Sequence, residues 1–132
     1  MAIYLWIALG SALGGVARYW SSGFVAVHFG ETFPVGTLVV NVVGSFVIGF
    51  VATLTAPDGR LLVSTEMRQF FMLGLCGGYT TFSSFSIQTL EMLRDGEWFR
   101  AGAYSVLSVL LCVVGVWLGH VAAAVFNQLK GS

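Results

Sequence analysis

Long apolar runs alternate with short polar stretches along this chain. Four segments stay apolar over about 20 residues, the length that an α-helix needs to cross the roughly 30 Å hydrocarbon core of a bilayer. The pattern places them at about residues 3–27, 35–54, 70–90 and 101–126. The connecting stretches hold all six acidic residues and four of the six basic ones. The sequence therefore predicts an all-α membrane protein, with four transmembrane helices in a single integral-membrane domain over residues 1–132.

Composition and charge support this interpretation. Charged residues make up 9% of the chain, against about 25% in a soluble globular domain, and the mean hydropathy is +0.87. The formal net charge is zero, so the chain lacks the basic surface that binds nucleic acid. We expect no nucleic-acid partner, and we expect a multi-pass protein whose main surroundings are a lipid bilayer.

Catalytic or metal-binding motifs do not emerge from the sequence. His28 and His120 have no Glu at the spacing of a zinc motif, and the glycine clusters lack the Lys and Ser/Thr of a phosphate-binding loop. Cys76 and Cys112 lie in different predicted spans without a second ligand at metal spacing. We expect the cysteines to be small buried apolar residues, and the protein not to be an enzyme.

Polar and small residues recur at helical spacing inside the spans. Side chains four residues apart share one face of a helix, and two such stripes are Thr37, Asn41 and Ser45, and Tyr104, Ser108 and Cys112. The amide of Asn41 needs hydrogen-bond partners that lipid cannot provide, so it faces protein or water. The pairs Gly10 with Gly14 and Gly115 with Gly119 favour close helix packing.

Arg18 is the one basic residue within the first three predicted spans. A charge at the centre of a membrane helix costs about 2.5–3.5 kcal/mol on the insertion scale, although a long side chain near a helix end can reach the interface. Two interpretations therefore stay open: an interface anchor, or a functional charge in a vestibule.

The third span contains the most unusual sequence, Gly-Gly-Tyr-Thr-Thr-Phe-Ser-Ser-Phe-Ser at 77–86. Glycine and hydroxyl residues disfavour a helix interior, so we predict a break at mid-membrane, centred at Thr80. Broken backbone at that depth survives where it lines a polar cavity, and its exposed carbonyls can bind a cation. The hydroxyls, with the positive ring edges of Phe82 and Phe85, suit a small anion.

Together with the motifs at 14–19 (Gly-Gly-Val-Ala-Arg-Tyr) and 36–46 (Gly-Thr-Leu-Val-Val-Asn-Val-Val-Gly-Ser-Phe), this stretch resembles the Fluc family of fluoride channels over essentially the whole chain. The resemblance implies passive export of fluoride across the bacterial inner membrane, which lowers its toxicity in the cytoplasm. It also implies an antiparallel, dual-topology homodimer of four-helix subunits.

The resemblance implies roles for individual residues as well. A structural sodium ion, Na+, would lie on the two-fold axis of the dimer and bind the backbone carbonyls of Gly77 and Thr80. Arg18 belongs to the motif of the first span. Cys112 stands where the stripe would continue with another hydroxyl. The residues implied for the fluoride pathway are Asn41, Phe82, Phe85, Ser83, Ser84, Tyr104 and Ser108.

Two other classes of membrane protein compete with a channel. A small multidrug-type proton-coupled exporter needs a carboxylate inside the membrane, and none of the predicted spans contains one. A membrane scaffold would explain the small-residue stripes but not a hydroxyl-rich break at mid-membrane.

Basic residues flank the spans evenly, which bears on orientation. One side would hold Arg60, Arg68 and Lys130, and the other would hold Arg94 and Arg100, with Arg18 leaning toward it. Because the distribution of Lys and Arg sets membrane orientation, three against three predicts that both orientations are made.

Overall fold

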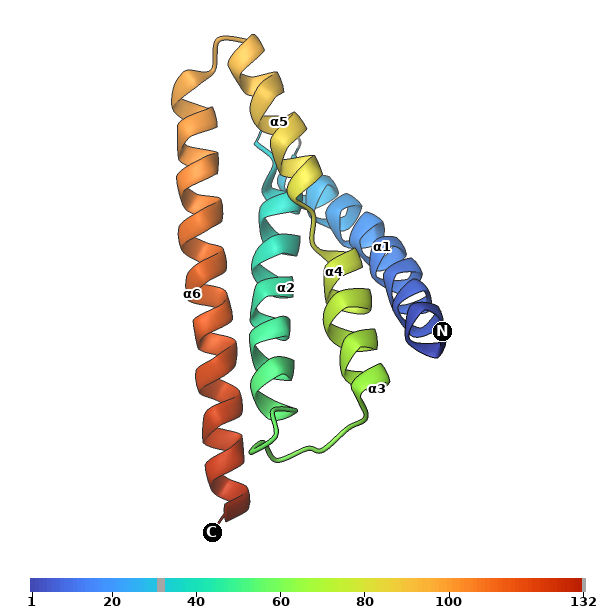
Figure 1. The fold of residues 1–132 in the computed structure, drawn as a ribbon. Coiled ribbons are helices and arrows are strands. Elements are labelled where there is room, and N and C mark those ends of the chain that lie inside the picture. Colours follow the sequence, from blue (N-terminus) through green and yellow to red (C-terminus); the bar gives the residue numbers. More distant parts are fainter. Residues whose placement is uncertain (31–32, 132) are drawn as a thin grey trace.

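The computed structural model describes residues 1–30 and 33–131, and these form helices joined by short turns (Figure 1). Side chains of residues 130 and 131 are not described. The elements in chain order are α1 (Ala2–Phe29), α2 (Val35–Leu54), α3 (Thr65–Gln69), the π-helix η1 (Phe70–Cys76), α4 (Gly77–Tyr79), α5 (Phe82–Arg94) and α6 (Trp98–Gly131).

The structure confirms the four-helix organisation and corrects some of its limits. The bounds of α2 agree with those predicted, whereas α1 and α6 extend beyond the predicted 3–27 and 101–126. The third helical segment runs from Thr65 to Arg94 as α3, η1, α4 and α5, so helical structure extends beyond the predicted span 70–90 at both ends. Three helices in the described part are long and apolar enough to span a membrane, namely α1, α2 and α6. The third helical segment is interrupted between α4 and α5, where the break was predicted.

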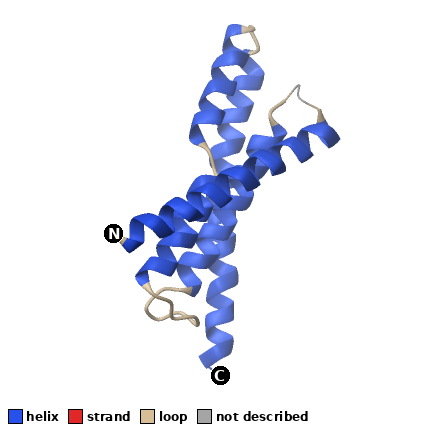
Figure 2. Ribbon diagram, turned by 90° about the vertical axis from the view of Figure 1, so that its right-hand side faces the viewer, coloured by secondary structure: helices blue, strands red, loops and turns tan. Residues whose placement is uncertain are grey.

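α2 packs against α6 along most of its length and lies at the centre of the fold, with α6 along one side (Figure 1). α1 crosses obliquely over η1 and α4, while α5 leans away from α1 and packs on α6 (Figures 1 and 2). The C-terminus and the loop between α2 and α3 lie at one end of the molecule, and the turn between α5 and α6 lies at the other (Figure 1). The break between α4 and α5 therefore lies between the two ends, beside α2.

Glycines allow these helices to approach closely. A Cβ atom on Gly119 would collide with the carbonyl oxygen of Phe46 on α2, and one on Gly115 would lie 3.1 Å from the Val42 carbonyl oxygen. On the other side, a Cβ on Gly10 would lie 2.9 Å from the Cα of Gly74. These contacts confirm that the small-residue pairs serve helix packing.

Side-chain hydrogen bonds close the end of the bundle where α2 terminates. The Arg68 guanidinium donates to the Ala52 carbonyl (3.1 Å) and to Thr55 Oγ1 (3.0 Å). This placement suits a cation, because the last carbonyls of a helix have no partner within it. His120 Nδ1 lies 2.7 Å from Thr53 Oγ1 and thereby links α6 to α2.

Candidate functional site

The break in the third helix consists of two extended residues. Thr80 (φ −83°, ψ 160°) and Thr81 (φ −153°, ψ 117°) both leave the helical region. The Thr81 hydroxyl then accepts a hydrogen bond from the backbone N–H of Ser84 at 3.1 Å. Threonine is a favourable N-cap because its oxygen satisfies a free N–H of the first turn. One helix thus ends at Tyr79, directly after a glycine pair, and the next begins at Phe82, directly after the capping hydroxyl of Thr81.

Asn41 of α2 pairs with both backbone groups of Thr81. Its Nδ2 donates to the Thr81 carbonyl at 3.0 Å, and its Oδ1 accepts from the Thr81 N–H at 2.7 Å. An unpaired backbone group in hydrocarbon costs several kcal/mol. The Asn41 amide therefore replaces the hydrogen-bond acceptor that the Thr81 N–H would have in a continuous helix. A primary amide has two N–H donors, and the pairing leaves one of them for another acceptor.

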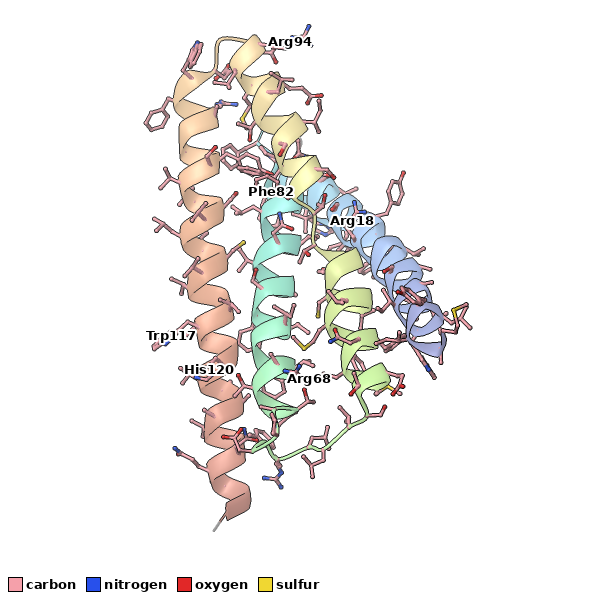
Figure 3. All side chains as sticks on the ribbon, in the orientation of Figure 1. Arg18, Arg68, Phe82, Arg94, Trp117 and His120 are labelled. Atoms are coloured by element: carbon pink, nitrogen blue, oxygen red, sulfur yellow. The ribbon has the colours of Figure 1, made fainter. Side chains whose placement is uncertain are left out.

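Arg18 contacts the same break from α1. Its Nε donates to the Gly78 carbonyl at 3.1 Å, and nearby the Tyr79 hydroxyl donates to Ser21 Oγ at 3.0 Å. Figure 3 shows Arg18 beside the turn between α4 and α5, with Phe82 at the start of α5. The side chain of Arg18 is therefore directed at the break, not at either end of the bundle.

Two carbonyls at the break have lost their helical donors. In a continuous helix the Gly77 carbonyl would accept from the Thr81 N–H, and the Thr80 carbonyl would accept from the Ser84 N–H. Those two N–H groups donate instead to Asn41 Oδ1 and to Thr81 Oγ1. Gly77 and Thr80 are the residues whose carbonyls the family resemblance implied as ligands of a cation.

A cleft of about 320 Å³ lies against the break, between α2 and α6. Its wall is mainly apolar and carries only a few polar groups. Its lining residues are Asn41, Gly44, Ser45, Ile48, Cys76, Gly77, Thr80, Thr81, Phe82, Phe85, Ser108, Val109 and Cys112. The cleft thus brings together six of the nine residues assigned to the pathway and the cation. Ser83, Ser84 and Tyr104 are not among its lining residues.

Ser108 supplies an unusual polar group to this wall. Its side chain is 8% exposed, and its Oγ atom makes no hydrogen bond with any residue that the structure describes. Buried hydroxyls normally find a partner, because an unsatisfied one costs about 1–3 kcal/mol. Ser108 is thus a residue of the cleft wall whose buried hydroxyl the described residues leave unsatisfied.

Aromatic rings line up at the start of α5. The Phe85 ring centroid lies 5.3 Å from that of Phe82 and 5.0 Å from that of Tyr104. Phe82 is 78% exposed, whereas Tyr104 is fully buried and donates its hydroxyl to Gln88 Oε1 at 2.8 Å. The Tyr104 ring is therefore buried against Phe85, and its hydroxyl already has Gln88 Oε1 as an acceptor.

The sequence did not single out Thr81 or Gln88 as site residues. Thr81 could have been found, because a threonine directly before the helical residues 82–94 is a standard N-cap. Gln88 carried no local signal, since its partner is 16 residues away. Cys76 is buried, in agreement with its expected apolar role, and Cys112 is half-buried on the wall of the cleft.

Comparison with known proteins places this arrangement in a family. The family described as CrcB-like protein, Camphor Resistance (CrcB), matches residues 5–120, which include all three motifs and the break. The chain belongs to the CrcB family. The resemblance drawn from the sequence is thereby confirmed.

CrcB relatives match this chain over nearly its whole length. A protein of Opitutus terrae is 66% identical over all 132 residues of both chains, and its name is "Fluoride-specific ion channel FluC". Relatives with the same name from Methylocella silvestris and Rhodospirillum rubrum are each 57% identical, and the alignments cover at least 95% of both chains. This chain is therefore a multi-pass membrane protein of an ion-channel family and not an enzyme.

Proposed function

We propose that this CrcB-family protein is a fluoride-selective ion channel that exports fluoride by passive conduction across the bacterial inner membrane and so limits fluoride toxicity in the cytoplasm. The observation that carries the proposal is the unpartnered hydroxyl of Ser108, buried at the wall of a cleft that also holds the rings of Phe82 and Phe85. The name shared by its relatives points to the same ion.

The chemistry of the cleft suits a small, strongly hydrated anion. Such an ion needs donors that replace its water while each site stays weak enough to release it. The remaining N–H of Asn41, the Ser108 hydroxyl and the positive ring edges provide donors of this kind. The cleft lining includes no Lys or Arg, which would hold the anion too tightly, and no carboxylate for a proton-coupled exporter. The pathway continues along Ser83 and Ser84 and past Tyr104.

An antiparallel homodimer and a central sodium ion complete the proposal. The Phe82 ring is exposed at the break in the single subunit, and a second copy of the chain in opposite orientation would pack against it. Sodium binds well to carbonyls of unwound membrane helices, and the Gly77 and Thr80 carbonyls have lost their helical donors. Within the described residues no group of three His, Cys, Asp or Glu side chains could bind a metal, so backbone oxygens would hold the ion, whose charge would stabilise the paired breaks.

The direct test measures efflux from liposomes loaded with fluoride or chloride. Wild-type protein should release fluoride passively and retain chloride. Ser108→Ala should slow fluoride efflux by roughly two- to tenfold, the equivalent of one net hydrogen bond, without abolishing it. Leu110→Ala is the matched control, because Leu110 lies on the same helix and is 57% exposed. Chloride efflux equal to fluoride efflux in the wild type would refute a fluoride-selective channel.

Orientation gives a second test, because basic residues bias the two ends of the protein only weakly. Since Arg18 contacts the break, the balance is Arg60, Arg68 and Lys130 against Arg94 and Arg100. The side chain of Lys130 lies outside the described residues. We expect both orientations in the cell.

The experiment uses a variant without Cys76 and Cys112, into which Asp58→Cys or Asp95→Cys introduces one exposed thiol. These positions lie in loops at opposite ends of the molecule (Figure 1). An impermeant thiol reagent applied to intact cells should label about half of each variant. Complete labelling of one variant with none of the other would exclude dual topology.

A further inference from the structure

Side chains from α1 and α2 form hydrogen bonds with some of the backbone groups around the break and leave others without a side-chain partner. Asn41 pairs with the N–H and carbonyl of Thr81, and Arg18 occupies the carbonyl of Gly78. The carbonyls of Gly77, directly before this set, and of Thr80, within it, are left without their helical donors, because the N–H groups of Thr81 and Ser84 donate to side chains. We infer that Arg18 is a positioning residue for the cation site, in that its Nε–H holds the break open so that these two carbonyls remain available. The inference rests on the proposed sodium site.

The packing of α1 explains how Arg18 reaches the break. Gly10, Gly14 and Arg18 are spaced four residues apart and share one face of α1. A Cβ on Gly14 would collide with the Leu75 carbonyl oxygen, and one on Gly78 would lie 2.6 Å from the Ser11 carbonyl oxygen. Because these glycines let the two backbones touch, Arg18, the next residue on that face, lies beside α4 and reaches the Gly78 carbonyl.

The Gly78 carbonyl has two alternative donors. In a continuous helix it would accept from the Phe82 N–H, and in the broken helix it accepts from Arg18. If Arg18 could not donate, the carbonyl would be unpaired in hydrocarbon, which is costly. Rejoining Gly78 to Phe82 would relieve that cost, but it would also bring the Thr81 N–H back to the Gly77 carbonyl. The bond from Arg18 therefore opposes closure of the break and the loss of a cation ligand.

The donor atom distinguishes this role from that of a vestibule charge. Arg18 is not among the residues that line the cleft, and the bond to Gly78 is made by Nε. Glutamine places an amide nitrogen at the same number of bonds from Cα as arginine Nε, but carries no charge. Lysine keeps the charge and has a methylene at that position. Methionine lacks both donor and charge.

The experiment follows thermal unfolding of the purified dimer, prepared throughout in N-methyl-D-glucamine and titrated with sodium chloride, beside fluoride efflux of the same variants. Wild-type protein should be stabilised by sodium. Arg18→Gln should reach half-maximal stabilisation at nearly the wild-type sodium concentration, whereas Arg18→Lys and Arg18→Met should need at least about tenfold more. Fluoride efflux at a fixed low sodium concentration should follow the same order.

The possible results separate the inference from the proposal beneath it. Without a sodium effect on the wild type, the sodium site itself is refuted. With a wild-type effect, Arg18→Lys matching the wild type while Arg18→Gln needs more sodium would show that the charge matters, and would overturn the positioning role. Equal sodium midpoints in all four proteins would also overturn it. Failure of Arg18→Met to fold leaves the comparison of Gln with Lys decisive.

Discussion

Replacing Asn41 with leucine is expected to abolish fluoride conduction and to destabilise the fold. The leucine side chain has a similar volume but cannot pair with Thr81, so the Thr81 N–H loses its acceptor and the Thr81 carbonyl loses one of its donors. An unsatisfied buried group costs about 1–3 kcal/mol, and the lost bond to the carbonyl adds about 1 kcal/mol. The measurements are fluoride efflux from liposomes and thermal unfolding in detergent.

The carboxylate variant refines this test. An ionised aspartate in Asn41→Asp can accept from the Thr81 N–H, but it places a second oxygen against the Thr81 carbonyl and offers no donor. Protonation would restore the donor, so Asn41→Asp should gain thermal stability relative to wild type as the pH falls. Ser45→Ala is the matched control, because Ser45 lies one turn further along α2 on the same cleft. Wild-type stability of Asn41→Leu would show that the amide does not support the break.

The fold follows from local signals in the sequence to a large extent. The spans α1, α2 and α6 are set by apolar length, and the interruption near Thr80 by glycines and hydroxyls in succession. The two ends of the third helical segment, beyond the predicted span 70–90, also have local signals. Ser64 accepts from the Met67 N–H at 3.2 Å as an N-cap, and Gly96 (φ 78°) ends the helix at the other side. Their polar surroundings suggested loops when only hydropathy was considered.

Contacts across large sequence separations could not be predicted in this way. The partner of Asn41 is 40 residues away and that of Arg18 is 60 residues away. From the sequence alone, Asn41 faces protein or water and Arg18 is either an interface anchor or a functional charge, and the family resemblance implied a place for Asn41 in the ion pathway. The structure directs one N–H and the carbonyl oxygen of the Asn41 amide at the backbone of the break.

Two neighbouring glycines of α1 should respond with opposite signs to the same substitution. A Cβ on Gly14 would collide with the Leu75 carbonyl oxygen and lie 2.8 Å from the Tyr79 nitrogen, whereas no described atom lies within 4 Å of a Cβ on Gly15. The atoms that obstruct Gly14 belong to backbone and cannot turn away. Gly14→Ala must therefore separate α1 from the broken helix, at a cost of about 3 kcal/mol or more.

Gly15→Ala should leave stability unchanged or raise it by about 0.5–1 kcal/mol, because alanine restricts the unfolded chain and favours helix. Thermal unfolding should show Gly14→Ala lower than wild type by more than about 10 °C and Gly15→Ala at or above it. Separation of α1 would also draw Arg18 away from Gly78, so Gly14→Ala should lose fluoride efflux, and Gly15→Ala should retain it. Equal destabilisation by both substitutions would mean that a neighbour outside this subunit, and not the broken helix, sets the limit on α1.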